Sequence, residues 1–124
     1  MNGPVYFEIQ ADNPNRAAWF YGEVFGWKFE KAAGLVEYWR IETAGIQGGL
    51  LKRPAQVPPP LSGTNAFVCS VEVESFDKAS EKILSLGGQV ALPKFAVPGR
   101  CWQGYFIDTD GNTFGIFQVD GAAR

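Results

Sequence analysis

The chain has no histidine, only two cysteines and a single methionine among its 124 residues. Histidine is the commonest metal ligand and the commonest general acid or base, so its absence removes the usual source of both chemistries. Cys69 and Cys101 are too few to form a disulfide framework, and we expect both to be reduced. No apolar run approaches the roughly 18 residues that a helix needs to cross a bilayer.

The chain also has no large excess of charge of either sign, since it contains 11 basic and 13 acidic residues and its net charge is −2. Nucleic-acid binding needs clustered Lys and Arg, so it is not expected. The first six residues have neither the basic nor the apolar region of a secretory signal. We therefore expect a cytoplasmic protein that binds neither nucleic acid nor membrane.

Glycine, proline and aromatic residues are plentiful: 15 Gly, 8 Pro, 10 Phe, 4 Trp and 4 Tyr. The first two predict many turns, and the aromatics predict a substantial core. A chain of this length is expected to form a single domain, 1–124.

The first half of the chain is predicted to form a strand, a helix and three further strands. Residues 5–10 alternate in polarity, which predicts a strand with Tyr6 and Glu8 on one face. Asn13 and Pro14 then predict a helix start, and Gly26 its end. Three further strands are predicted at 27–30, 36–42 and 46–52, the second with Tyr38, Arg40 and Glu42 on one face and Trp39 and Ile41 on the other.

The second half repeats this order. A strand is predicted at 66–74, with Val68 and Ser70 on one face and Cys69 on the other as a small buried residue. Ser75 predicts a helix start, and glycines 87 and 88 its end. The remaining strands are predicted at 89–92, 101–108 and 113–119, with a turn at 108–112.

An offset of 62 residues superimposes the two halves in pattern, for example Asn13 on Ser75 and Gly26 on Gly88. We interpret this as an internal duplication with modules at 4–52 and 65–119, a proline-rich linker at 53–64 and a tail at 120–124. The predicted fold is α+β: two βαβββ modules that form a curved mixed sheet, with a concave cleft and the helices outside.

Three segments resemble the vicinal oxygen chelate superfamily of glyoxalases, bleomycin-resistance proteins and extradiol dioxygenases. They are the opening run 6–14, the helix end 20–27 (Phe-Tyr-Gly-Glu-Val-Phe-Gly-Trp) and the closing turn and strand 105–115 (Tyr-Phe-Ile-Asp-Thr-Asp-Gly-Asn-Thr-Phe-Gly). The resemblance spans nearly the whole chain, but these motifs are structural and do not identify a reaction.

The resemblance implies four positions for the metal ligands of metal-using members. They fall at Tyr6, Val68, Gly115 and either Gly48 or Gly49. None is a good donor, because Val and Gly cannot coordinate a metal and a neutral phenol is a poor ligand. We therefore predict no metal and no cofactor.

The cleft that the resemblance implies would be lined from both halves by polar and aromatic residues: Tyr6, Glu8, Tyr38, Arg40, Glu42, Val68, Ser70, Gly115, and either Gln103 and Tyr105 or, in the other strand orientation, Trp102. Glu8 and Arg40 are expected to form an ion pair; alternatively, Arg40 could bind an anionic ligand. Aromatic side chains here favour binding over catalysis.

These observations predict a metal-free small-molecule-binding protein that resembles bleomycin-resistance proteins and takes an aromatic or hydrophobic ligand. The resemblance also implies a homodimer, for which Trp19 is a candidate contact. Three alternatives remain open: a cofactor-free isomerase or lyase that uses Glu8 or Glu42 with Tyr6, a metal-dependent lyase or dioxygenase with unexpected ligands, and an interaction domain whose cleft is filled by its own side chains.

Overall fold

The computed structural model describes residues 2–34, 37–53 and 67–124, so the predicted linker at 53–64 lies outside the described residues except for Arg53. The chain divides into two compact units, 1–58 and 59–124. Each unit contains one helix and one four-stranded sheet. No helix in the described part of the chain is both long and apolar enough to span a membrane.

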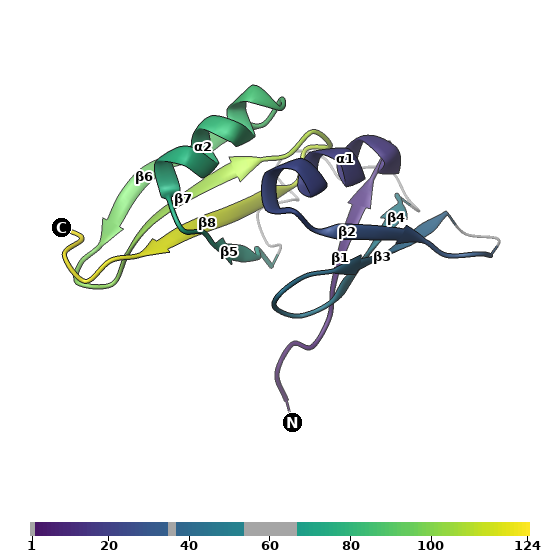
Figure 1. Ribbon diagram of the computed structural model, residues 1–124, viewed down its shortest axis with the longest axis horizontal. Coiled ribbons are helices and arrows are strands. Elements are labelled where there is room, and N and C mark those ends of the chain that lie inside the picture. Colours follow the sequence, from purple (N-terminus) through teal and green to yellow (C-terminus); the bar gives the residue numbers. More distant parts are fainter. Residues whose placement is uncertain (1, 35–36, 54–66) are drawn as a thin grey trace. The chain divides into compact units, whose positions relative to one another are not determined.

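The first unit has the predicted order of strand, helix and three strands (Figure 1). Its elements are β1 (Phe7–Ala11), α1 (Pro14–Phe25), β2 (Lys28–Lys31), β3 (Tyr38–Glu42) and β4 (Gly48–Lys52). The strands lie in the order β1-β4-β3-β2. β1 runs parallel to β4, while the β3–β4 and β2–β3 pairs are antiparallel, so the sheet is mixed.

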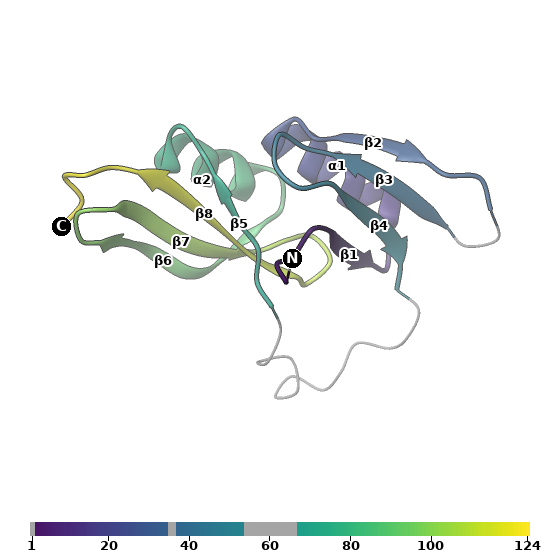
Figure 2. The same ribbon diagram turned by 90° about the horizontal axis from the view of Figure 1, so that it is seen from below.

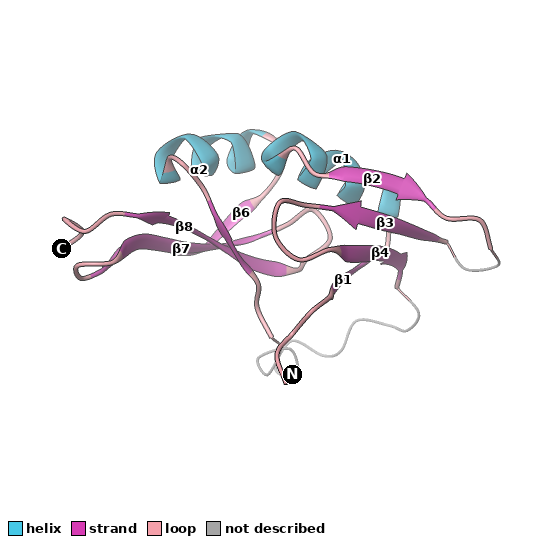
Figure 3. Ribbon diagram, turned by 60° about the horizontal axis from the view of Figure 1, so that its bottom comes forward, coloured by secondary structure: helices cyan, strands magenta, loops and turns pink. Residues whose placement is uncertain are grey.

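Helix α1 begins and ends as its sequence predicts. The Asn13 side chain accepts a hydrogen bond from the backbone N–H of Arg16 at 3.2 Å, and Gly26 closes the helix in the left-handed region at φ 73°. The helix lies over one face of its sheet (Figure 3). A core of Ala11, Ala17, Trp39, Ile41 and Leu50 is buried on that face. The other face is left open, and it carries the polar residues of the strands.

The second unit repeats this arrangement (Figure 2). Its elements are β5 (Ser70–Glu72), α2 (Phe76–Ser85), β6 (Gln89–Val97), β7 (Cys101–Ile107) and β8 (Thr113–Val119). The order β5-β8-β7-β6, with β5 parallel to β8, matches the first sheet strand for strand. The fold is therefore α+β, built from two βαβββ units with mixed sheets.

The start of the second unit differs from its prediction. Within the described part of the strand expected at 66–74, only the three residues of β5 form a strand, and residues 67–69 and 73–74 do not; residue 66 lies outside the described residues. The alternation therefore does not continue back to Cys69, which is exposed, and the prediction that this cysteine is a small buried residue is wrong. Phe67 is likewise fully exposed.

Strand β6 is longer than predicted, since it continues from Gln89 to Val97 through Pro93. Its register against β7 shifts between Val90 and Leu92 and again between Leu92 and Phe95. Proline has no N–H to donate to a neighbouring strand. Pro93 is tolerated here because β6 is the edge strand of its sheet.

Candidate functional site

The open face of the first sheet carries most of the residues predicted to bind a ligand. On β3, Trp39 and Ile41 are buried under α1, with 7% and 2% of their surface exposed, while Arg40 and Glu42 are exposed on the opposite face. On β1, Phe7 and Ile9 pack against the core and Glu8 is exposed, as is Tyr6, which directly precedes the strand. The predicted alternation is confirmed within β1 and β3, but the first strand begins at Phe7 and does not include Val5, which is 80% exposed.

Strand register sets four residues in a row across this face. Glu8 on β1 pairs with Gly49 on β4, Gly49 pairs with Arg40 on β3, and Arg40 pairs with Glu30 on β2. Directly opposite residues share a face of the sheet, so these four lie side by side. Gly49 leaves a gap in the row because it has no side chain.

The hydroxyl groups of Tyr6 and Tyr38 meet above this gap in a mutual hydrogen bond. A Cβ atom built on Gly49 would lie 2.7 Å from the Tyr6 hydroxyl and closer still to that of Tyr38. The hydrogen bond to Tyr6 raises the pKa of Tyr38 to about 12, with burial and the charge of Glu8 acting in the same direction. Tyr38 is therefore a neutral phenol at physiological pH.

Arg40 forms its ion pair with Glu30 and not with Glu8. Its Nη2 donates to Glu30 Oε1 at 2.6 Å, and both side chains are well exposed, at 60% and 76%. The expected Glu8–Arg40 pair is therefore wrong. Glu30 stands directly opposite Arg40 on the neighbouring strand, whereas Glu8 lies two strands away across Gly49.

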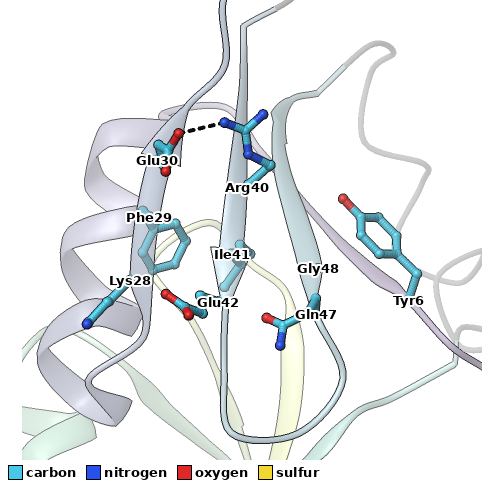
Figure 4. A pocket seen from close by; sticks show the side chains of 9 residues that line it. All are labelled: Tyr6, Lys28, Phe29, Glu30, Arg40, Ile41, Glu42, Gln47 and Gly48. Atoms are coloured by element: carbon cyan, nitrogen blue, oxygen red, sulfur yellow. Dashed lines mark hydrogen bonds and ion pairs between the residues drawn. The ribbon is translucent and has the colours of Figure 1, made fainter.

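A hollow of about 600 Å³ opens on this face (Figure 4). It is lined by nine residues of the first unit: Tyr6, Lys28, Phe29, Glu30, Arg40, Ile41, Glu42, Gln47 and Gly48. The prediction included Tyr6, Arg40 and Glu42 but missed Lys28, Glu30 and Gln47. The alternation of residues in β2 could have predicted two of them: Phe29 packs against the core, so its neighbours Lys28 and Glu30 lie on the open face.

The second sheet has a corresponding row. Ser70 on β5 pairs with Gly115 on β8, which pairs with Tyr105 on β7. Gln103 Nε2 donates a hydrogen bond to Ser70 Oγ at 3.2 Å. The space beside Gly115 is filled, since a Cβ there would lie 2.9 Å from Gln103 Nε2, 3.0 Å from the Tyr105 ring and in close contact with Ser70 Oγ.

Of the two orientations left open for β7, the structure has Gln103 and Tyr105 on the face of Ser70. Trp102 lies on the other face, where it pairs with Gln118 and its indole N–H donates to Asp120 Oδ2 at 3.0 Å. Val68 precedes β5 and is 44% exposed. The structure thus groups Ser70, Gln103, Tyr105 and Gly115, and leaves Trp102 out of that group.

The pairing of the glycines shows that the two units share one register. Gly49 pairs with Glu8 as Gly115 pairs with Ser70, and Glu8 and Ser70 are the residues that the predicted offset superimposes. A family model, Glyoxalase/Bleomycin resistance protein/Dioxygenase superfamily, matches residues 3–116. The chain belongs to this superfamily. Its two βαβββ units are thus the duplicated architecture that the sequence motifs predicted.

Other members of the glyoxalase superfamily are similar over most of the chain. A glyoxylase-like domain-containing protein of Didymella fabae is 30% identical over 121 residues, covering 88% of each chain. A putative glyoxylase, CFP32, of Mycobacterium bovis is 23% identical, and the match covers 94% of this chain but 46% of that protein.

Solved structures share the fold at low identity. The fosfomycin resistance protein FosX of Listeria monocytogenes superimposes with a TM-score of 0.73 at 18% identity, covering 97% of this chain and 95% of that one. A glyoxalase/bleomycin resistance protein/dioxygenase family enzyme from Burkholderia phytofirmans PsJN superimposes with a TM-score of 0.73 at 15% identity, covering 94% of this chain and 98% of that one. A mutant of the Listeria protein has been solved in complex with Mn(II) and 1S,2S-dihydroxypropylphosphonic acid.

The residues of this chain do not fit such a metal. Of the two glycines left open for the first carboxylate position, Gly49 is the one in register with Gly115. Neither has a donor, and hydroxyl or amide groups occupy the space where a carboxylate would extend. The other two positions hold Tyr6, whose phenol is a poor metal ligand beside imidazole or carboxylate, and Val68, whose alkyl side chain has no donor atom. Within the described residues, no group of three or more Cys, Asp or Glu side chains could hold a metal ion.

Proposed function

We propose that this glyoxalase-superfamily chain is a metal-free small-molecule-binding protein that takes an aromatic or hydrophobic ligand. The observation that carries the proposal is that glycine, which has no donor atom in its side chain, stands at both carboxylate positions that the resemblance implies, Gly49 and Gly115, each flanked by hydrogen-bonding side chains. The hollow beside Tyr6 supports it, because small-molecule sites combine concave apolar walls with a few polar groups. In its lack of a metal the chain would resemble bleomycin-resistance proteins.

Two measurements test this function. Elemental analysis of the purified protein should find far less than one zinc, nickel, iron or manganese ion per chain, and added Mn²⁺ should not raise the melting temperature. A thermal-shift screen of aromatic antibiotics and small metabolites should find compounds that do raise it, because a ligand stabilises the state that it binds. About one bound ion per chain would contradict the metal-free assignment.

The Tyr6→Ala variant connects the ligand to this face. Tyr6 is 47% exposed, so its truncation should change the melting temperature by only a few degrees while weakening the binding of any compound from the screen. Val5→Ala, at an 80% exposed neighbour, is the matched control and should leave binding unchanged. Global unfolding of Tyr6→Ala would show that Tyr6 is a core residue.

A cofactor-free isomerase or lyase is the second candidate, because Glu42 and Tyr6 both line the hollow and could act as base and acid. A compound from the screen that is converted, with a pH–rate profile set by a carboxylate and loss of turnover in Glu42→Gln, would favour it. Unchanged compound after long incubation favours binding alone.

The proposal includes a homodimer and a cytoplasmic site of action. Trp19 is 51% exposed on α1 and is the candidate contact, so Trp19→Ala should shift a dimer toward monomer in analytical ultracentrifugation. Both cysteines are free, which suits a reducing compartment. Cell fractionation tests that location.

A further inference from the structure

The tyrosine pair is a polar feature that the packing of the sheet does not require. Tyr6 precedes β1 and Tyr38 opens β3, and their hydroxyls meet over Gly49 on the strand between them. The buried core lies on the opposite face, under α1. Only a glycine at this position leaves room for the pair, since any Cβ would contact both hydroxyls.

The pair has hydrogen-bonding capacity left over. Two hydroxyl groups carry two protons, and the bond between them uses one. Among the described residues, neither hydroxyl has a further hydrogen-bond partner. One O–H is therefore available to a ligand, and the raised pKa of Tyr38 keeps that phenol protonated at physiological pH. The pair is thus a neutral donor.

The charges of the residues that line the hollow balance, and Glu8 adds a negative charge beside the tyrosine pair, outside that lining. Lys28 and Arg40 line the hollow with two positive charges, and Glu30 and Glu42 line it with two negative ones. Arg40 is already paired with Glu30. A ligand anion would have to share Arg40 with that carboxylate, and a ligand cation would meet Lys28. The lining therefore favours an uncharged ligand, and the tyrosine pair gives such a ligand one directed hydrogen bond.

We propose that the Tyr6–Tyr38 pair over Gly49, which meets the hollow through its lining residue Tyr6, anchors a carbonyl oxygen, so that the hollow takes flat, uncharged carbonyl compounds. This inference rests on the proposed binding function and adds the chemical class of the ligand. The half-exposed ring of Tyr6 gives the flat part of the ligand an aromatic surface to stack on.

Three probes of matched size test the class: acetophenone, ethylbenzene and benzoate. Acetophenone has the neutral oxygen, ethylbenzene lacks it, and benzoate replaces it with an anion. Dissociation constants from ligand-observed NMR titrations should rank acetophenone about five-fold tighter than ethylbenzene, the worth of one hydrogen bond. Benzoate should bind more weakly than acetophenone.

The double variant Tyr6→Phe/Tyr38→Phe keeps both rings and removes both hydroxyls. It should bind ethylbenzene as before and acetophenone no better than ethylbenzene. Gly49→Ala, which forces the hydroxyls apart, should reduce the same preference in a second background. Gly45→Ala is its control, because a Cβ there meets nothing nearer than Thr43 Oγ1 at 3.8 Å.

The outcomes separate the two proposals. Equal binding of acetophenone and ethylbenzene, tightest binding of benzoate, or a preference that survives in the double variant would each overturn the anchor while leaving the binding function intact. Failure of all three probes to bind would overturn the binding function for aromatic ligands, and the anchor with it.

Discussion

The stability of the protein should respond to an added methyl group more strongly at Gly48 than at the adjacent Gly49. A Cβ on Gly48 would lie 2.6 Å from the ring of Phe7, which packs against Trp27 at a centroid distance of 5.6 Å and against the buried core. The ring cannot move away freely, so overpacking should cost about 1–3 kcal/mol. Replacing glycine in a strand returns about 0.5–1 kcal/mol. The overpacking cost exceeds the gain from replacing glycine, so Gly48→Ala should lower the free energy of unfolding by about 1–2 kcal/mol.

A Cβ on Gly49 meets only the ends of two flexible phenols on the open face. These can separate and bind water, so the cost is one hydrogen bond, about 0.5–1.5 kcal/mol. The gain from replacing glycine offsets most of it. Gly49→Ala should therefore change stability by less than about 1 kcal/mol, since the two terms nearly cancel.

Urea unfolding followed by tryptophan fluorescence measures both variants, with an unchanged m-value as the condition for comparing them. The reasoning depends on which glycine faces the core. A Gly49→Ala variant that is less stable than Gly48→Ala would refute it, because the buried and open faces would then be exchanged.

Three further predictions follow from contacts in the first unit. The pKa of Tyr38 should fall from about 12 toward its usual value in the Tyr6→Phe variant, as measured by phenolate absorbance. Because a raised pKa means that the folded state favours the neutral phenol, the hydrogen bond contributes to the stability of the fold below pH about 10. This contribution is lost as the pH rises toward 12. An unchanged titration would show that the hydrogen bond is not its cause. Leu50→Ala removes a side chain with no exposed surface and should cost about 2–5 kcal/mol in urea unfolding; a loss below 1 kcal/mol would contradict its place in the core. Glu30→Gln breaks the exposed ion pair with Arg40 and should cost less than about 1 kcal/mol, with a smaller effect at high salt; a large, salt-insensitive loss would mean the pair is buried.

The sequence predicted those helix ends and strand faces that depend on residues close together in the chain. Asn13 and Gly26 bound α1 because capping and left-handed closure act within one turn of the helix. Alternation placed Trp39 and Ile41 in the core because one face of β3 is buried and the other is open.

Features that depend on register between distant strands could not be predicted. The partner of Arg40 is Glu30 because β2 and β3 pair with those residues opposite, and the sequence of the segment between the strands does not specify that alignment. The choice between Gly48 and Gly49 likewise needed the pairing with β1. Cys69 was misplaced because β5 starts one residue after it, and alternation has no meaning outside a strand.

The irregular edge strand β6 has a consequence for how copies of this chain can associate. Val90, Leu92 and Phe95 are exposed there, and an edge strand with exposed apolar side chains can pair with a strand of another molecule. Pro93 lacks an amide proton, and the two register shifts interrupt the regular backbone of the strand. Growth of a continuous ladder along this border, and the fibrous aggregation that it can seed, is thereby discouraged even though the strand is rich in apolar residues.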